Sequence, residues 1–203
     1  MAEFTGTTGD DGITRCTWCL ASPLYTHYHD TEWGFPVDDD TRLYEKLCLE
    51  GFQAGLSWLT ILNKRENFRA AFAGFDMDVV AAFTDDDVQR LLGDAGIIRH
   101  RGKIEAAINN ARRAREMRER EGSLGAFFWR YAPDVASTGE DVPALTPEST
   151  ALSKELKRRG WKFVGPTTVY AHMQSMGLVN DHAPGCVTRP LAEQARRAFT
   201  VPQ

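Results

Sequence analysis

One carboxylate stands on an otherwise apolar helical face, where it could take part in binding. The face is defined by the spacing of Leu43, Leu47, Glu50 and Ala54, which recur as on one side of an α-helix. A carboxylate buried on such a face is costly unless it is paired, so Glu50 requires a cationic neighbour or a ligand. An internal arginine would give Glu50 a structural role. A ligand would make it a binding residue.

Aromatic residues are dense in the sequence around Glu50. They are Trp18, Tyr25, Tyr28, Trp33 and Trp58. Each of them could be an ordinary core residue. Together with one carboxylate they would form a cage that suits a flat cation, because an aromatic ring attracts positive charge to its face. These five residues and Glu50 are therefore candidates for a binding pocket.

Cysteine and histidine residues near both ends of the sequence could hold a metal. Cys16 and His29 lie near the start, and His182 and Cys186 lie near the end at H-x3-C spacing. Two cysteines and two histidines can bind zinc in a tetrahedral site. Cys19 offers an alternative, because Cys16-x2-Cys19 is itself a typical zinc-binding pair. The spacing alone favours Cys16, Cys19, His182 and Cys186.

A short turn between two predicted helices could bind phosphate. Residues 159–168 read RGWKFVGPTT. Pro166 suits the first position of a helix, and Gly165 lets another molecule approach the backbone closely. The free N–H groups at the start of the next helix would face the same way. Lys162, Gly165 and Thr167 are therefore candidate DNA-binding residues, and an ordinary turn between helices is the alternative.

The composition and charge of the chain limit the classes of protein to which it can belong. The 203 residues include 24 Lys+Arg and 28 Asp+Glu, a net charge of −4, and 42% are hydrophobic. Basic residues nevertheless gather in 97–122 and 154–162, so one basic face could still bind a polyanion. The sequence has no apolar run of about eighteen residues, which predicts no membrane span. Its first residues lack a secretory signal, which predicts a cytoplasmic protein whose four cysteines are thiols or metal ligands rather than disulfides.

Helical patterns fill most of the chain, and the predicted fold class is all-α. Helices are expected over 43–53, 57–72, the residues after a capping box at Thr84 and Asp87, 101–118, the residues after Ser123, 148–159 and 167–176. Gly160 and Gly177 are expected to end the last two. Residues 132–147 contain Pro, Gly and Ser and are expected to form a loop.

Seven motifs in order carry a resemblance to a known family. They are RCTW, SPLYTHYHDTEWG, CLEGFQAGLSWLTIL, KREN, DAGIIRHRGKI, GWKFVG and GLVNDH. From Arg15 to Pro190 the chain resembles the 3-methyladenine DNA glycosylase I family of the helix-hairpin-helix DNA glycosylase superfamily. In that superfamily a catalytic aspartate lies two residues before a histidine. This chain has Asn180 there, a departure that points to the methyladenine branch.

The resemblance implies an organisation and a metal site. It implies a single glycosylase domain over 15–190, with a disordered tail at 1–14 and a C-terminal tail at 191–203. Within the domain we expect a helical lobe over about 40–131, a hairpin over about 159–168, and a zinc-tied lobe formed by 15–30 and 178–190. The implied ligands of one structural zinc ion are Cys16, His29, His182 and Cys186, rather than the set that includes Cys19.

The resemblance also implies an activity and roles for the pocket. The family flips 3-methyladenine out of alkylated double-stranded DNA and excises it by hydrolysis, without strand cleavage. Glu50, Tyr28 and Trp58 match the base-contacting catalytic positions, and Trp18, Tyr25 and Trp33 match the pocket walls. The protein is expected to act as a monomer and without a membrane. The alternatives are a glycosylase for another damaged base, a zinc-stapled module that binds DNA without chemistry, and a strand-cleaving lyase that uses Lys162.

Overall fold

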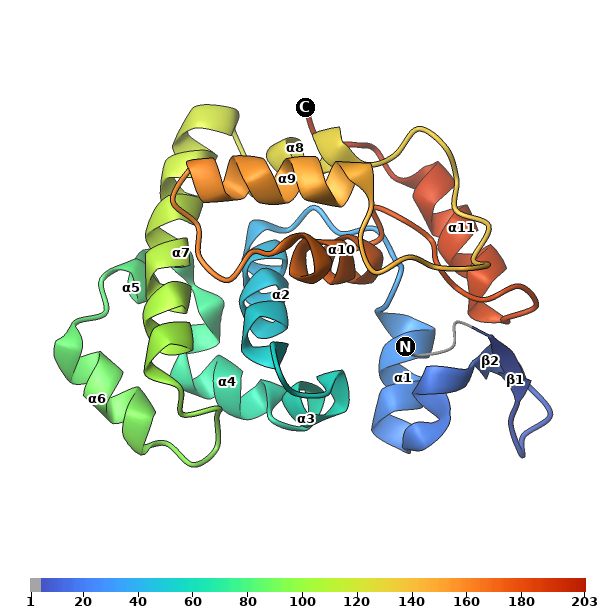
Figure 1. Ribbon diagram of the computed structural model, residues 1–203, viewed down its shortest axis with the longest axis horizontal. Coiled ribbons are helices and arrows are strands. Elements are labelled where there is room, and N and C mark those ends of the chain that lie inside the picture. Colours follow the sequence, from blue (N-terminus) through green and yellow to red (C-terminus); the bar gives the residue numbers. More distant parts are fainter. Residues whose placement is uncertain (1–4) are drawn as a thin grey trace.

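The computed structural model describes residues 5–203, which fold into a mainly helical protein (Figure 1). The regular elements are β1 (Gly6–Thr8), β2 (Thr14–Cys16), η1 (Thr17–Ala21), α1 (Pro23–Thr31), α2 (Asp40–Gln53), α3 (Trp58–Asn63), α4 (Arg65–Ala71), η2 (Ala73–Phe75), α5 (Met77–Ala81), α6 (Asp85–Gly93), α7 (Arg101–Glu121), α8 (Leu124–Phe128), η3 (Trp129–Tyr131), α9 (Pro147–Arg158), α10 (Pro166–Ser175) and α11 (Thr188–Ala198). The prediction of a mainly α-helical chain is confirmed. No helix in residues 5–203 is long and apolar enough to cross a membrane.

Helix α2 is the centre of the fold and is covered by other helices (Figure 1). It starts where the Asp39 side chain accepts a hydrogen bond from the Arg42 N–H. From Leu43 to Phe52 every residue is buried. Polar side chains on this stretch, Glu50 among them, are therefore buried with the apolar ones and need partners inside the protein.

Several helix boundaries follow the signals in the sequence. Ser57 and Ser123 cap the starts of α3 and α8, and the Thr84–Asp87 capping box starts α6. The expected helix over 57–72 is instead two helices, α3 and α4, which meet at Lys64. The Lys64 ammonium donates to the carbonyls of residues 95 and 96, so the break is fixed by a contact distant in sequence.

Both segments expected to be tails contain regular structure. Residues 1–4 lie outside the described part of the chain, but β1 and β2 form an antiparallel pair in which Gly6 faces Cys16. The C-terminal segment contains α11, after which Phe199 packs on Trp129 with ring centroids 4.5 Å apart. Arg196 at the end of α11 donates a hydrogen bond to the Gly177 carbonyl. Disorder was expected for residues 1–14, but residues 6–8 and 14 belong to the β1–β2 pair, and the segment expected as a C-terminal tail carries most of α11.

Strand β2 lies beside the segment that leads into α11 (Figure 1). The N–H of Val187, just before α11, donates to the Thr14 carbonyl in β2 at 2.9 Å. The Ala183 N–H donates to the Cys16 sulfur at 3.3 Å. These contacts bring the cysteines and histidines from the two ends of the sequence into one region.

The turn between α9 and α10 is held by α7. Asn110 of α7 is buried and bonds both backbone groups of Lys162, accepting from its N–H at 2.9 Å and donating to its carbonyl at 2.9 Å. Asn109 donates to the Gly160 carbonyl. Gly160 has a φ of 83°, a left-handed conformation that favours glycine and ends α9 as expected. The predicted loop over 132–147 carries no helix or strand up to residue 146.

Candidate active site and metal centre

All six residues expected to form a pocket line a single cavity of about 160 Å³. Trp18 comes from η1, Tyr25 and Tyr28 come from α1, and Trp33 follows α1. Glu50 comes from α2, and Trp58 is the first residue of α3. The remaining lining residues are Lys46, Gln53, Ala171 and Gln174. The structure thus brings the predicted pocket residues together and adds four that the sequence analysis missed.

The rings form two contacting groups. Trp18 contacts Tyr25 and Trp33, with ring centroids 4.8 and 5.1 Å apart. Tyr28 contacts Trp58, with centroids 5.5 Å apart. Tyr25 and Tyr28 are three residues apart on α1 and therefore point to the same side of the helix. The rings are held by one another, so their faces are preset for a flat ligand.

Glu50 is paired inside the protein, and its partner is a lysine. The Lys46 ammonium lies 2.6 Å from Glu50 Oε1, and both side chains are less than a tenth exposed. The structural partner expected from the sequence was an internal arginine, but the partner is Lys46, which precedes Glu50 by one helical turn. The ammonium also lies 3.0 Å from the centroid of the Trp58 ring and 5.2 Å from that of Tyr28. Burial lowers its pKa to about 8, against the opposing effect of Glu50.

Three of the pocket rings keep polar atoms without partners. Trp18 Nε1, Tyr28 Oη and Trp58 Nε1 are buried and have no hydrogen-bond partner among residues 5–203. Buried polar groups are normally satisfied, because leaving one unpaired costs about 1–3 kcal/mol. The pocket therefore offers unused donors next to a carboxylate, which suits a polar aromatic ligand.

A hydrogen-bonded group behind the pocket fixes Gln174. Asp181 Oδ2 accepts a bond of 2.8 Å from the Gln174 amide and one of 2.7 Å from the Tyr170 hydroxyl. Neither Gln174 nor Asp181 could be placed from the sequence, because their contact depends on how α10 meets the segment after it. Asn180 lies outside the pocket and bonds His182 Nδ1 at 2.9 Å through its side-chain oxygen.

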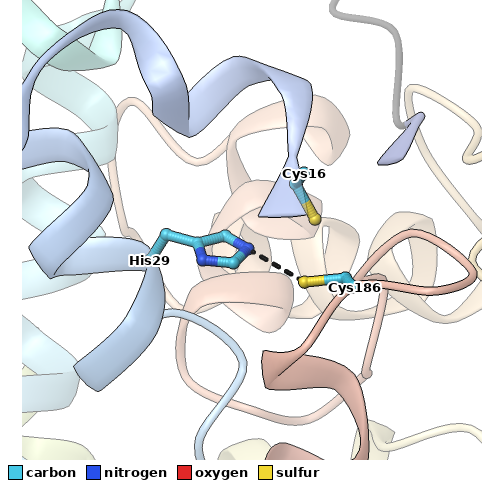
Figure 2. Close-up of side chains that lie close together, drawn as sticks. All are labelled: Cys16, His29 and Cys186. Atoms are coloured by element: carbon cyan, nitrogen blue, oxygen red, sulfur yellow. Dashed lines mark hydrogen bonds between the residues drawn. The ribbon is translucent and has the colours of Figure 1, made fainter. Parts of the chain in front are cut away.

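A buried group of possible metal ligands comes from β2, α1 and the segment before α11 (Figure 2). The ligand atoms of Cys16, His29 and Cys186 lie within 4.8 Å of one another. Figure 2 shows the His29 ring pointing toward the Cys186 sulfur, 3.5 Å from Nε2. Hydrogen bonding from the Cys16 thiol, with a further contribution from His29, lowers the pKa of the Cys186 thiol. A lowered pKa favours the thiolate, the form in which cysteine binds metals.

Two further residues adjoin this group. The His182 ring lies 4.9 Å from the His29 ring, centroid to centroid, and its Nε2 is buried without a partner among residues 5–203. Cys19 is also buried, on η1. Neither side chain has its ligand atom within the group of three. Three of the four implied metal ligands are thus assembled, and His182 stands next to them.

The candidate DNA-binding residues lie on the turn between α9 and α10 and not in the pocket. Lys162 and Thr167 are exposed. Gly165 starts α10 with a φ of −62°, and a side chain added there would meet nothing within 4 Å. The fold itself therefore does not require glycine at position 165.

Comparisons with known proteins agree with this architecture. Residues 18–189 match the methyladenine glycosylase family. The chain is 52% identical to DNA-3-methyladenine glycosylase 1 of Escherichia coli (strain K12), over 88% of this chain and 98% of that one. A crystal structure of a 3-methyladenine DNA glycosylase I is 51% identical and superposes with a TM-score of 0.82, over 87% of this chain and all of that one. The structure of the Staphylococcus aureus enzyme is 37% identical with a TM-score of 0.82, over 86% of this chain and 96% of that one.

The helical fold that positions the aromatic pocket is that of a DNA base glycosylase. More particularly, the chain belongs to the methyladenine glycosylase family.

The Lys46–Glu50 pair predicts how Glu50→Gln affects stability. The change removes the carboxylate charge and leaves a buried ammonium without its ionic partner. We expect the free energy of unfolding near pH 7 to fall by about 1–3 kcal/mol. The loss should shrink as the pH rises through about 8, because the wild-type amine then loses its own proton.

Urea unfolding at several pH values measures this effect. The double variant Lys46→Met/Glu50→Gln removes both charges and should recover most of the loss. Unchanged or higher stability of Glu50→Gln near pH 7 would show that Lys46 and Glu50 are not paired in solution.

Proposed function

We propose that this methyladenine glycosylase excises 3-methyladenine from alkylated double-stranded DNA by hydrolysis of the glycosidic bond, without cutting the strand. The observation that supports this most is the pocket, in which aromatic faces surround one carboxylate. Adenine methylated at N3 within DNA is a flat cation. An aromatic cage with a carboxylate suits such a base better than it suits a neutral purine.

Binding requires the damaged base to leave the helix. Flipping costs a few kcal/mol and is cheapest for a base that is already poorly stacked. Stacking on the rings of Tyr28 and Trp58 would offset this cost by about 1–3 kcal/mol per base. Glu50 would accept a hydrogen bond from the exocyclic amine of the base. Trp18, Tyr25 and Trp33 would form the walls, and the unused Trp18 and Trp58 donors would meet the acceptors of the base.

The chemistry follows from the charge on the base. When the bond between C1′ and the base nitrogen breaks, both electrons go to the base, which becomes neutral, and the sugar becomes an oxocarbenium-like cation. Water adds to C1′ and gives a proton to the solvent, leaving an abasic site. The pocket favours the cationic ground state more than the transition state, so it contributes selectivity rather than rate.

In this mechanism Asn180 has no chemical role. An amide has no charge to stabilise the sugar cation, and Asn180 lies outside the pocket with its oxygen on His182. The DNA phosphates would stabilise the cation instead. Lys162 is exposed on the turn, outside the pocket, and a strand-cleaving role for it has no support in its position.

A structural zinc ion is the proposed occupant of the buried metal centre. The donor set fits, because the lowered pKa of Cys186 favours the thiolate and His182, whose Nε2 is unpartnered among residues 5–203, adjoins His29. Asp30 bonds His29 Nδ1 at 2.7 Å and Asn180 bonds His182 Nδ1, which leaves both Nε2 atoms for a metal. Zinc bound there would tie the two chain ends together and would not take part in the reaction.

The turn between α9 and α10 is the proposed helix-hairpin-helix contact with DNA. Its backbone N–H groups and the exposed Lys162 and Thr167 would bind phosphates, which position the protein without reading sequence. The open space over Gly165 leaves room for the DNA backbone. We further infer that the protein acts as a monomer in the cytoplasm.

The role of Glu50 predicts a loss of excision in Glu50→Gln. Losing a charge-assisted hydrogen bond costs about 1.5–3 kcal/mol, so release of 3-methyladenine should fall roughly ten- to a hundredfold or more. Affinity for undamaged duplex should barely change. The matched control is Glu45→Gln, since Glu45 is also a buried carboxylate of α2 but pairs with Arg69 away from the pocket lining. Equal excision rates per folded molecule in the two variants would contradict a base-binding role for Glu50.

The metal centre predicts different effects for two neighbouring cysteines. Cys19→Ser should retain one zinc ion per chain, whereas Cys16→Ser should lose it, as measured by metal analysis of purified protein. Removing zinc from the wild type with a chelator should lower its melting temperature, because metal binding adds to folding free energy. Loss of zinc in Cys19→Ser and not in Cys16→Ser would exclude the proposed ligand set.

The hairpin predicts that Gly165→Val weakens DNA binding without unfolding the protein. The backbone at Gly165 is one that valine can adopt, and its side chain would project into open space. Affinity should fall for damaged and undamaged duplexes alike. Gly93→Val, at another glycine with open space, is the control. Wild-type affinity of Gly165→Val for both duplexes would remove the hairpin from the DNA interface.

A further inference from the structure

The pocket already contains a cation of its own. The Lys46 ammonium sits against Glu50 Oε1 and over the face of the Trp58 ring, which are two of the three groups proposed to bind the damaged base. Tyr28, the third, is also within reach of the ammonium. Lys46 therefore makes with its own side chain the interactions that a flat cationic ligand would need.

Of the carboxylates near Lys46, only Glu50 is not already paired with an arginine among the described residues. A second, smaller cavity adjoins Lys46. The other polar and charged residues that line it are Tyr28, Glu32, Arg42, Glu45, Arg65 and Arg69. Arg65 binds both oxygens of Glu32 at 2.7 and 2.8 Å, and Arg69 binds Glu45 at 2.8 Å. Glu50 is thus the carboxylate that balances the ammonium.

A cationic base would compete for that carboxylate. With the base bound and Lys46 still charged, two positive charges would share Glu50 and the same aromatic rings in a buried space. We propose that Lys46 is a resident cation that gates the pocket, so that the cationic base binds only when the Lys46 amine gives up its proton. This inference rests on the proposed function and adds a residue that controls entry to the pocket.

The same competition would assist release of the product. Cleavage of the glycosidic bond returns its electrons to the base, which leaves as a neutral molecule. A neutral base no longer competes with the Lys46 ammonium for the Glu50 carboxylate and the face of the Trp58 ring. Lys46 takes up a proton from solvent and regains both contacts, and the neutral base is released.

The protonation of Lys46 should make cation binding depend on pH, and this dependence can be measured. Burial lowers the pKa of Lys46 to about 8. Among the groups around Lys46, burial raises the pKa of Tyr28. The ion pair between Arg65 and Glu32 raises the pKa of Arg65 and lowers that of Glu32. These three groups keep one charge state from about pH 7 to about pH 9. A change in cation binding over that range therefore reports on Lys46.

The probe is adeninium methylated at N3 and N9, a permanent cation in which a methyl group replaces the sugar. Calorimetric titration of the wild type should show its affinity rising about tenfold per unit below about pH 8 and levelling above it, because one proton leaves Lys46 for each cation bound. Lys46→Met should bind the probe independently of pH and at least as tightly as the wild type at high pH. Lys46→Arg, which keeps its charge, should bind it weakly at every pH.

Lys64→Met is the matched control, because Lys64 bonds backbone carbonyls outside the pocket. It should keep the wild-type pH profile. A flat wild-type profile, or a wild-type slope retained in Lys46→Met, would overturn the gate. If Lys46→Met does not fold, the wild-type and Lys46→Arg profiles decide the question. Excision of 3-methyladenine with a flat profile would reject the gate alone, whereas a folded protein that neither excises nor binds the probe would reject the proposed function.

Discussion

The burial of Glu50 inside the helical core is the constraint on which the rest of this site depends. A carboxylate on a central helix has to be neutralised, and Lys46 does so from the preceding turn at 2.6 Å. The aromatic rings that exclude water from the pair are the same rings that line the pocket. Charge, shape and stability are therefore coupled at one place, and a change to either charged residue affects folding and ligand binding together.

The pocket in turn depends on contacts between distant parts of the chain. Trp18, Tyr25 and Tyr28 come from the N-terminal segment, and Gln174 comes from α10, whereas Glu50 comes from α2. The N-terminal segment is placed by contacts of β2 and Cys16 with residues 183–187. A metal at Cys16, His29 and Cys186 would strengthen that connection. It would support the pocket walls without touching the base.

The sequence predicted the parts of the site that have local or periodic signals. Glu50 was found from helical spacing, the caps at Ser57, Ser123 and Thr84 from local hydrogen-bonding patterns, and the pocket aromatics from their density. Lys46 was missed because only the apolar residues were used to define the face, although Lys46 lies one turn before Glu50 on the same side of α2. Helix α11 was missed because it contains Pro190, and proline suggests the end of a helix, although the first turn of a helix tolerates it. Asn110 and Asp181 act through tertiary contacts that no local pattern encodes.

Hydrolytic excision of a cationic base is tested most directly by incubating the purified protein with methylated duplex DNA, separating the released bases by chromatography, and running the DNA on a denaturing gel. We expect free 3-methyladenine in the soluble fraction and strands that stay intact until the abasic sites are cleaved by alkali. Absence of released 3-methyladenine, or strand breaks that appear together with it before alkali treatment, would contradict hydrolytic excision by this pocket.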